Sequence, residues 1–208
     1  MKELMTNIEE DIEWRTSQIA IIKLLPLKSN LNEKDIGFLI KNSTPIIYSL
    51  WEGFLKEIHS CLHKYIDRKI KKDPAYFKED IHISAYILNK TCNFEKERNN
   101  IDDILEHVEK IFELIDKPYL IKPSKYKGSS FNYNNTEKLL SIFSIHCVDK
   151  KYRDDLDEFL KMRNRIAHGD GVRFIEVNME DISKFSEMII NLMYDIFLNI
   201  EKRFGKFE

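Results

Sequence analysis

Apolar residues recur every three or four positions along most of this 208-residue chain, and this spacing constrains its fold more than any other feature. Such a spacing places the apolar side chains on one face of an α-helix. The chain contains only 6 Gly and 5 Pro, which also favours helices over sheets. We therefore predict a mainly α fold, and the length favours one domain, residues 1–208, around a single core. The pattern is clear at about residues 4–25, 47–66, 101–115, 152–167 and 182–200.

Proline and capping residues predict where the first helices begin and end. The first helix should end at Pro26, and a short helix should follow at about residues 31–41. Ser43-Thr44-Pro45 has the pattern of an N-cap followed by proline in the first turn. We therefore expect a long helix to begin there and to reach about Lys71.

The second half of the chain is divided by further caps and turns. Asn135 should cap a short helix that runs to Cys147, and Asn178 should cap the last helix, which reaches about Arg203. The apolar residues of this last helix cover more than one side, so we expect a second copy of the chain to bury part of it. Irregular or extended structure is expected at residues 74–100, with one or two strands, and at residues 172–177.

Composition excludes several classes of protein. A formal net charge of -2 gives no overall basic field, so any contact with nucleic acid must come from local clusters. The 3 cysteines have no paired spacing, which argues against a disulfide framework and against a thiolate zinc site. His59 and His63 lack further ligands at useful spacing, so we expect surface histidines and no metal site. Without a signal-peptide core or a long uncharged span, we expect a cytoplasmic protein that does not enter membranes.

One local cluster mixes lysines with aromatic residues. Residues 117–136 contain no acidic side chain, and two interpretations of the segment remain open. In the first, lysines contact RNA phosphates while aromatic rings stack on bases. In the second, the segment is a solvated connector whose aromatic residues cover the core. The residues concerned are Lys117, Lys122, Lys125, Lys127, Tyr119, Tyr126, Phe131 and Tyr133, of which Lys122, Lys125, Lys127 and Tyr126 are the candidate RNA-binding residues.

The end of the helix predicted at about residues 152–167 carries Arg163, Asn164 and His168 within six positions. Arg163 falls inside the apolar stripe of this helix, where an arginine needs a partner. Gly169 should end the helix in a left-handed conformation just after His168. Residues five apart on a continuous helix are separated by roughly 140°, so we expect unwinding at Gly169 to bring His168 back toward Arg163.

These side chains meet the needs of RNA cleavage without a metal. That reaction requires a base for the 2′-OH proton, a cation near the phosphate oxygens and an acid for the 5′-oxygen. A histidine such as His168 exchanges protons near neutral pH, and Arg163 can bind a phosphate through two hydrogen bonds. Asn164 would orient either the histidine or a phosphate oxygen, and Arg165 would add charge.

The run Arg163-Asn164-Arg165-Ile166-Ala167-His168-Gly169 resembles the signature of HEPN ribonucleases, in which a His follows an Arg and a neighbouring polar residue after four to six positions. Two further segments, residues 12–15 (IEWR) and 51–57 (WEGFLKE), look like the MAE-type HEPN-like nucleases. The resemblance covers nearly the whole chain, although residues 74–130 match only loosely.

This resemblance implies a single HEPN-like domain, an antiparallel helical bundle with irregular insertions between helices. It further implies a homodimer with a composite active site and metal-independent endonuclease activity on RNA, with no cofactor. Such proteins often act in phage defence or in toxin–antitoxin pairs, so an antitoxin or another defence protein is an expected partner. Asp170 stands where HEPN toxins controlled by adenylylation carry a Tyr, which argues against that form of control here.

Other interpretations of the same residues remain open. Glu52 and Arg15 are supporting candidates for the site, or they form a buried ion pair that positions the bundle. Arg163 could instead pair with a buried acid such as Glu52 while His168 caps helix carbonyls. For the whole chain, the alternative is a catalytically silent HEPN scaffold that binds RNA or a partner protein.

Overall fold

The computed structural model describes residues 1–28, 30–73, 109, 113, 130–145, 149–169 and 176–205. These residues form five α-helices and contain no strand, so the predicted mainly α fold is confirmed. The long elements are α1 (Lys2–Leu24), α2 (Glu33–Lys72), α6 (Tyr133–Ser141), α7 (Arg153–His168) and α8 (Met179–Phe204). Two short 3-10 helices, η1 (Leu25–Leu27) and η3 (Lys150–Tyr152), complete them.

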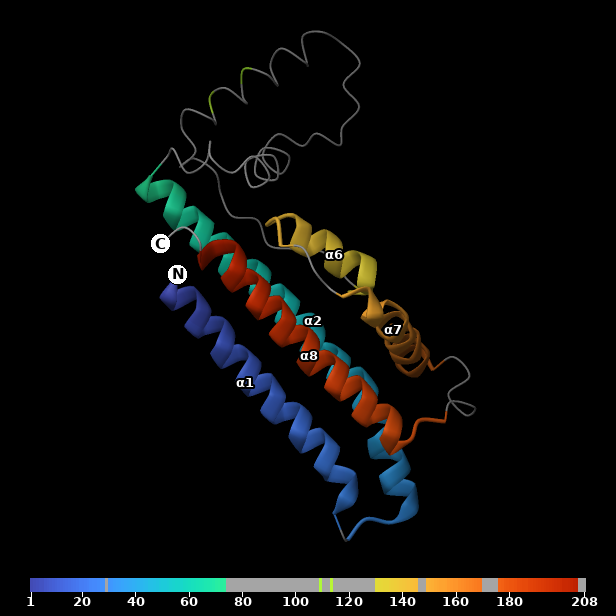
Figure 1. Ribbon diagram of the computed structural model, residues 1–208. Coiled ribbons are helices and arrows are strands. Elements are labelled where there is room, and N and C mark those ends of the chain that lie inside the picture. The colour runs from blue at the N-terminus through green and yellow to red at the C-terminus, as the bar shows by residue number, and fades with distance from the viewer. Residues whose placement is uncertain are drawn as a thin grey trace, which may run out of the picture.

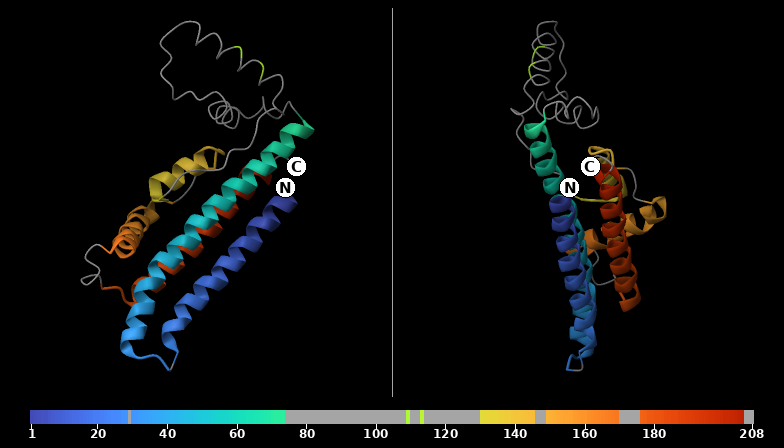
Figure 2. Two further views of the ribbon diagram at one scale, coloured as in Figure 1. Left: turned by 180° about the vertical axis from the view of Figure 1, so that it is seen from behind. Right: turned by 60° about the vertical axis from the view of Figure 1, so that its left-hand side comes forward.

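The helices α1, α2 and α8 lie side by side as a bundle (Figures 1 and 2). Helix α1 runs antiparallel to α2, and α8 returns parallel to α2, so both termini lie at one end of the bundle. Helices α6 and α7 lie beside the bundle, and α7 packs against α2. Large side chains that are almost fully buried fill the space between these helices, among them Trp51, Tyr48, Phe54, Phe159 and Phe185.

Helices α1 and α2 are held together by a buried arginine. Arg15 lies in the core-facing stripe of α1, as predicted, with 8% of its surface exposed. Its Nε donates a hydrogen bond to the Asp11 carboxylate, and its Nη1 donates one to the Leu50 carbonyl, both at 2.7 Å. A Cβ atom on Gly53 would lie only 2.7 Å from this Nη1. Glycine at position 53 therefore leaves the room that the guanidinium occupies.

The predicted start of α2 at Ser43-Thr44-Pro45 is wrong. Helix α2 begins at Glu33, where the Asn32 side chain caps it, and passes straight through Pro45. Ser43 and Thr44 are buried, so this part of the helix packs against the rest of the molecule. Burial along a 40-residue helix outweighs the local cost of a proline, which lacks an N–H to donate. The predicted end near Lys71 is confirmed.

The predicted cap of α6 is also wrong. Asn132 caps this helix by accepting a hydrogen bond from the Asn135 N–H, so Asn135 lies inside the helix. The helix ends at Ser141 and does not reach Cys147, because a turn follows in which Ser144 has a φ of 54°. The separate short helix predicted at about residues 31–41 is wrong as well, because these residues form the first part of α2. The predicted ends of α1 and α8 agree with the structure. Helix α1 gives way to η1 at Leu25, and Asn178 caps α8 through a capping box with Asp181.

The two histidines of α2 are not both surface residues. His59 is 2% exposed, and its ring lies 4.4 Å from that of His63, with Phe143 edge-on to both. The prediction of surface histidines fails at His59 because Phe143, which follows α6, packs on this side of α2. Among the residues that the structure describes, no group of three His, Cys, Asp or Glu side chains could hold a metal. No helix within these same ranges is long and apolar enough to cross a membrane.

Several predictions fall outside the described residues. They concern the strands at 74–100, the helix at 101–115, the lysines and tyrosines at 117–127, Asp170 and the extended segment at 172–175. Glu109 and Glu113 alone are described within the first three of these segments, and both lie in helical turns. Phe131 and Tyr133 are described and are 1% and 5% exposed, so these two aromatic rings belong to the core and not to an RNA-stacking surface.

Candidate functional site

Arg163 lies in the last two turns of α7 and is half-buried. Its guanidinium lies over the ring of Tyr48 from α2, with Cζ 5.1 Å from the ring centroid. Its Nη1 donates a hydrogen bond to Oδ1 of Asn164 at 2.9 Å. The described acidic residues form no ion pair with Arg163. Within the part of the chain that the structure describes, no carboxylate therefore neutralises this positive charge.

Tyr48 is a rigid support for this arginine. It is 1% exposed, and its ring meets that of Phe159 edge-on at a centroid distance of 5.8 Å. Its hydroxyl oxygen accepts a hydrogen bond of 2.6 Å from the Phe131 N–H. Burial raises the pKa of Tyr48 to about 12, and the nearby Glu52 carboxylate acts in the same direction. The phenol therefore stays protonated at neutral pH.

His168 is the last residue of α7 and is exposed. Gly169 follows with a φ of 74°, so the predicted left-handed end of the helix is confirmed. The helix stays regular up to His168, and the expected unwinding toward Arg163 does not occur. The two side chains therefore point about 140° apart around the axis of one helix. No described residue forms a hydrogen bond with the imidazole.

The other residues of the motif divide between two faces of α7. Arg165 is exposed and lies three positions before His168, so these two residues share the outer face of the helix. Asn164 is half-buried and bonded to Arg163. The structure thus pairs Asn164 with the arginine, whereas the sequence suggested a role toward the histidine or a phosphate oxygen.

The two supporting candidates, Glu52 and Arg15, lie on different sides of α2. Glu52 follows Tyr48 by one helical turn and forms an ion pair with Lys56, so it lies beside the support of Arg163. Arg15 contacts Leu50 and Gly53, which face away from Tyr48. Neither of the ion pairs considered for Glu52, with Arg15 or with Arg163, is formed, because Arg15 pairs with Asp11.

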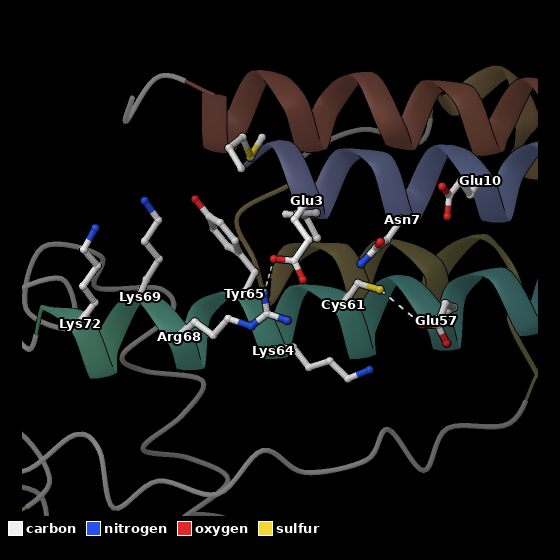
Figure 3. A pocket seen from close by; sticks show the side chains of 12 residues that line it. Glu3, Asn7, Glu10, Glu57, Cys61, Lys64, Tyr65, Arg68, Lys69 and Lys72 are labelled. Carbon is white, nitrogen blue, oxygen red and sulfur yellow. Dashed lines mark hydrogen bonds and ion pairs between the residues drawn. The ribbon is translucent and has the colours of Figure 1, made fainter.

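A groove lies between α1 and α2 (Figure 3). Helical spacing directs most of its α2 residues away from the side of Tyr48. Arg68 donates to Glu3 at 2.7 Å across it, and the Cys61 thiol donates to Glu57. Burial, together with the Glu57 carboxylate, raises the pKa of Cys61 to about 12, so this thiol is not a nucleophile at neutral pH. Its lining residues come from α1 and α2 and include none of α7, so this groove is separate from the site at Arg163. It is lined chiefly by Glu3, Asn7, Glu10, Glu57, Cys61, Lys64, Tyr65, Arg68, Lys69 and Lys72.

The family of the chain follows from a match that spans the bundle and the motif together. A family model described as HEPN_MAE_28990/-like HEPN matches residues 4–208. The chain belongs to this HEPN family. HEPN domains are often ribonucleases, and the HEPN fold commonly binds RNA and dimerises. No curated protein and no solved structure matches the chain.

Within this HEPN domain, Tyr48 is the site residue that sequence reasoning missed. It stands beside Ile47 in the apolar pattern of α2, and this pattern predicts only that the ring is buried. That the ring lies beneath Arg163 depends on how α7 crosses α2, which periodicity does not reveal.

Proposed function

We propose that this HEPN protein is a metal-independent endoribonuclease whose site is built from Arg163, Asn164 and His168. The observation that supports the proposal is the environment of the Arg163 guanidinium. Arg163 is held near the end of α7 on an aromatic ring, without a carboxylate partner among the described residues, and five residues before an exposed histidine. A guanidinium in this state suits a phosphodiester, whose negative charge increases in the transition state.

The reaction needs no group beyond these side chains and the RNA. A histidine accepts the 2′-OH proton, and O2′ attacks the neighbouring phosphorus. The bond from phosphorus to the 5′-oxygen breaks, and an acid protonates the leaving oxygen. The products are a 2′,3′-cyclic phosphate and a 5′-hydroxyl. Arg163 binds the phosphate oxygens, and Asn164 keeps the guanidinium in place through the bond at 2.9 Å.

The active form in this proposal is a homodimer with a composite site. The separation of about 140° between Arg163 and His168 on one regular helix supports this, because one chain does not aim both at the same phosphate. Two copies whose α7 ends meet in one cleft supply two histidines, one as base and one as acid. Cytoplasmic RNA is the substrate, and phage defence or a toxin–antitoxin pair, with its antitoxin or other defence partner, is the proposed context. Control by adenylylation is not part of the proposal, because Asp170 replaces the Tyr.

The test is cleavage of single-stranded RNA by the purified protein in the presence of EDTA. We expect cutting to continue, with products that carry 2′,3′-cyclic phosphate and 5′-hydroxyl ends. The matched substrate control is an oligonucleotide with 2′-deoxy sugars, which lacks the attacking group and should remain intact. Loss of cutting in EDTA, or 5′-phosphate products, would contradict the proposal.

A catalytically silent scaffold that binds RNA or a protein is the second candidate. The same separation of Arg163 and His168 favours it if the protein stays monomeric, because a single chain then has no complete site.

A further inference from the structure

We propose that Tyr48 is a positioning residue for Arg163: its ring holds the guanidinium in the orientation that receives the phosphate. The inference rests on the proposed function. The sequence motif lies on α7 alone, and the inference adds a residue of α2 to the same site. The observation that carries it is the placement of the guanidinium over the Tyr48 ring, with Cζ 5.1 Å from the centroid.

The ring is suited to this role because it is buried and held by its neighbours. Tyr48 is 1% exposed and is held at three places: by the Phe159 ring on its edge, by the Phe131 N–H on its hydroxyl and by its own helix. An arginine side chain, in contrast, has many rotamers, and most of them would direct the guanidinium away from a bound RNA. A fixed aromatic face beneath the cation reduces this freedom before the substrate arrives.

The contact with Tyr48 uses none of the N–H donors of Arg163, so they can be offered to a phosphate. A cation–π contact uses the face of the guanidinium, whereas its five N–H groups point outward in the plane. The structure gives one of these N–H groups to Asn164 through Nη1. The remaining donors include a pair on one edge, which matches two phosphate oxygens. Tyr48 thus contacts the guanidinium from below while Asn164 accepts from one of its corners, at Nη1.

The hydroxyl of Tyr48 makes a contact that is separate from the contact of its ring with Arg163. It accepts the Phe131 N–H, while the Trp51 indole N–H donates to the Phe131 carbonyl at 3.3 Å. These bonds attach the start of the α6 region to α2. Removing the hydroxyl should therefore affect stability, whereas removing the ring should also release Arg163. The two parts of one side chain can be separated by substitution.

The experiment compares Tyr48→Phe with Tyr48→Leu in the full chain. The first readout is the NMR resonance of the Arg163 Nε–H, assigned by its disappearance in Arg163→Lys. Ring current should shift this resonance upfield in the native protein and in Tyr48→Phe, and the shift should vanish in Tyr48→Leu. The second readout is RNA cleavage, where Tyr48→Leu should lower kcat by about tenfold with little change in KM, and Tyr48→Phe should restore it.

Circular dichroism controls for folding, and Tyr48→Met replaces Tyr48→Leu if the latter does not fold. A native kcat and an unchanged Arg163 resonance in the folded Leu or Met variant would overturn the inference. If the native protein cuts no RNA, the proposed function fails, and the NMR comparison still decides whether the Tyr48 ring holds Arg163.

Discussion

Two arginines, Arg15 and Arg163, lie in the apolar stripes of their helices, yet the structure uses them differently. Arg15 is buried and paired: its Nε donates to Asp11 and its Nη1 donates to the Leu50 carbonyl. Arg163 is half-buried above the ring of Tyr48, and among the described residues its hydrogen-bond partner is a neutral amide. A buried and paired arginine joins helices, whereas an unpaired one near the surface is free to bind an anion. Arg15 is therefore structural, and Arg163 is the arginine of the proposed site.

Gly53→Ala tests the structural role of Arg15. The added methyl group would lie 2.7 Å from Arg15 Nη1, so the guanidinium must leave its place, and we expect a loss of about 1–3 kcal/mol in the free energy of unfolding. The control is Gly37→Ala on the same helix, where no atom lies within 4 Å of the new Cβ. That change should stabilise the protein by about 0.5–1 kcal/mol, because alanine favours helix. Denaturant titration measures both, and equal effects would contradict the account of Arg15.

Cys61 makes the stability depend on pH in alkaline solution. Burial raises the pKa of its thiol from 9.0 to about 12, so the folded state favours the protonated thiol. This contribution is present below the unfolded pKa and is lost as pH rises from about 9 toward 12. At pH 10.5 the native protein should have lost on the order of 2 kcal/mol more than Cys61→Ala, relative to pH 8. Denaturant titrations at both pH values check this, and equal losses in the two proteins would refute it.

The candidate site was predictable in its members but not in its geometry. Arg163, His168 and the left-handed Gly169 follow from spacing and helix-end chemistry, and the structure places all three at the end of α7. The regular last turn, the bond between Asn164 and Arg163, and the Tyr48 ring depend on side-chain packing between two helices. The spacing of apolar residues along a sequence carries no information about such contacts between helices. Hence the prediction that His168 swings back to Arg163 differs from the structure.

Among the helices, α1, α7 and α8 were predicted almost to the residue, whereas α2 and α6 were not. The first three have boundaries set by local chemistry: Pro26, Gly169 and the capping box at Asn178. Pro45 misleads because the helix already begins at Glu33 and packing carries it through this apparent start signal. Asn135 misleads because Asn132, three residues earlier, is the cap. Capping and proline signals thus predict a helix boundary correctly where tertiary packing does not override them.

Asn178→Ala tests the local chemistry of α8. The Asn178 side chain accepts from the Asp181 N–H at 2.9 Å, and Asp181 returns a bond to the Asn178 N–H at 3.0 Å. Loss of this cap should reduce the free energy of unfolding by about 1 kcal/mol. Asn191→Ala, at an exposed position inside the same helix, is the control and should not destabilise the protein. Thermal melts distinguish the two, and a neutral Asn178→Ala would show that packing alone sets the start of α8.

At the scale of the whole molecule, α8 leaves two large apolar side chains exposed in a single chain. Most of its apolar residues are buried against α1, α2 and α7, but Tyr194 and Leu198 remain 44% and 56% exposed. A helix that is apolar on more than one side usually has a further partner. The HEPN fold commonly dimerises, so we expect the partner to be a second copy, as the proposed composite site also requires.

Light scattering tests this expectation. We expect the mass of a dimer at micromolar concentration, and Leu198→Lys should shift the protein toward the monomer, because a charge would be buried at the interface. Leu27→Lys, at a 66% exposed residue near the turn between α1 and α2, is the matched control and should leave the mass unchanged. A native monomer, or a dimer unaffected by Leu198→Lys, would remove α8 from the proposed interface.

The most direct test of the proposed ribonuclease is the rate constant of RNA cleavage by His168→Ala in EDTA. His168 is exposed and has no bonded partner among the described residues, so its removal should leave the fold intact. We predict a loss of about two orders of magnitude or more, the usual scale for a missing acid or base. Lys202→Ala, an exposed change in the last turn of α8, should cut at the native rate. Full activity in a folded His168→Ala variant would contradict the account.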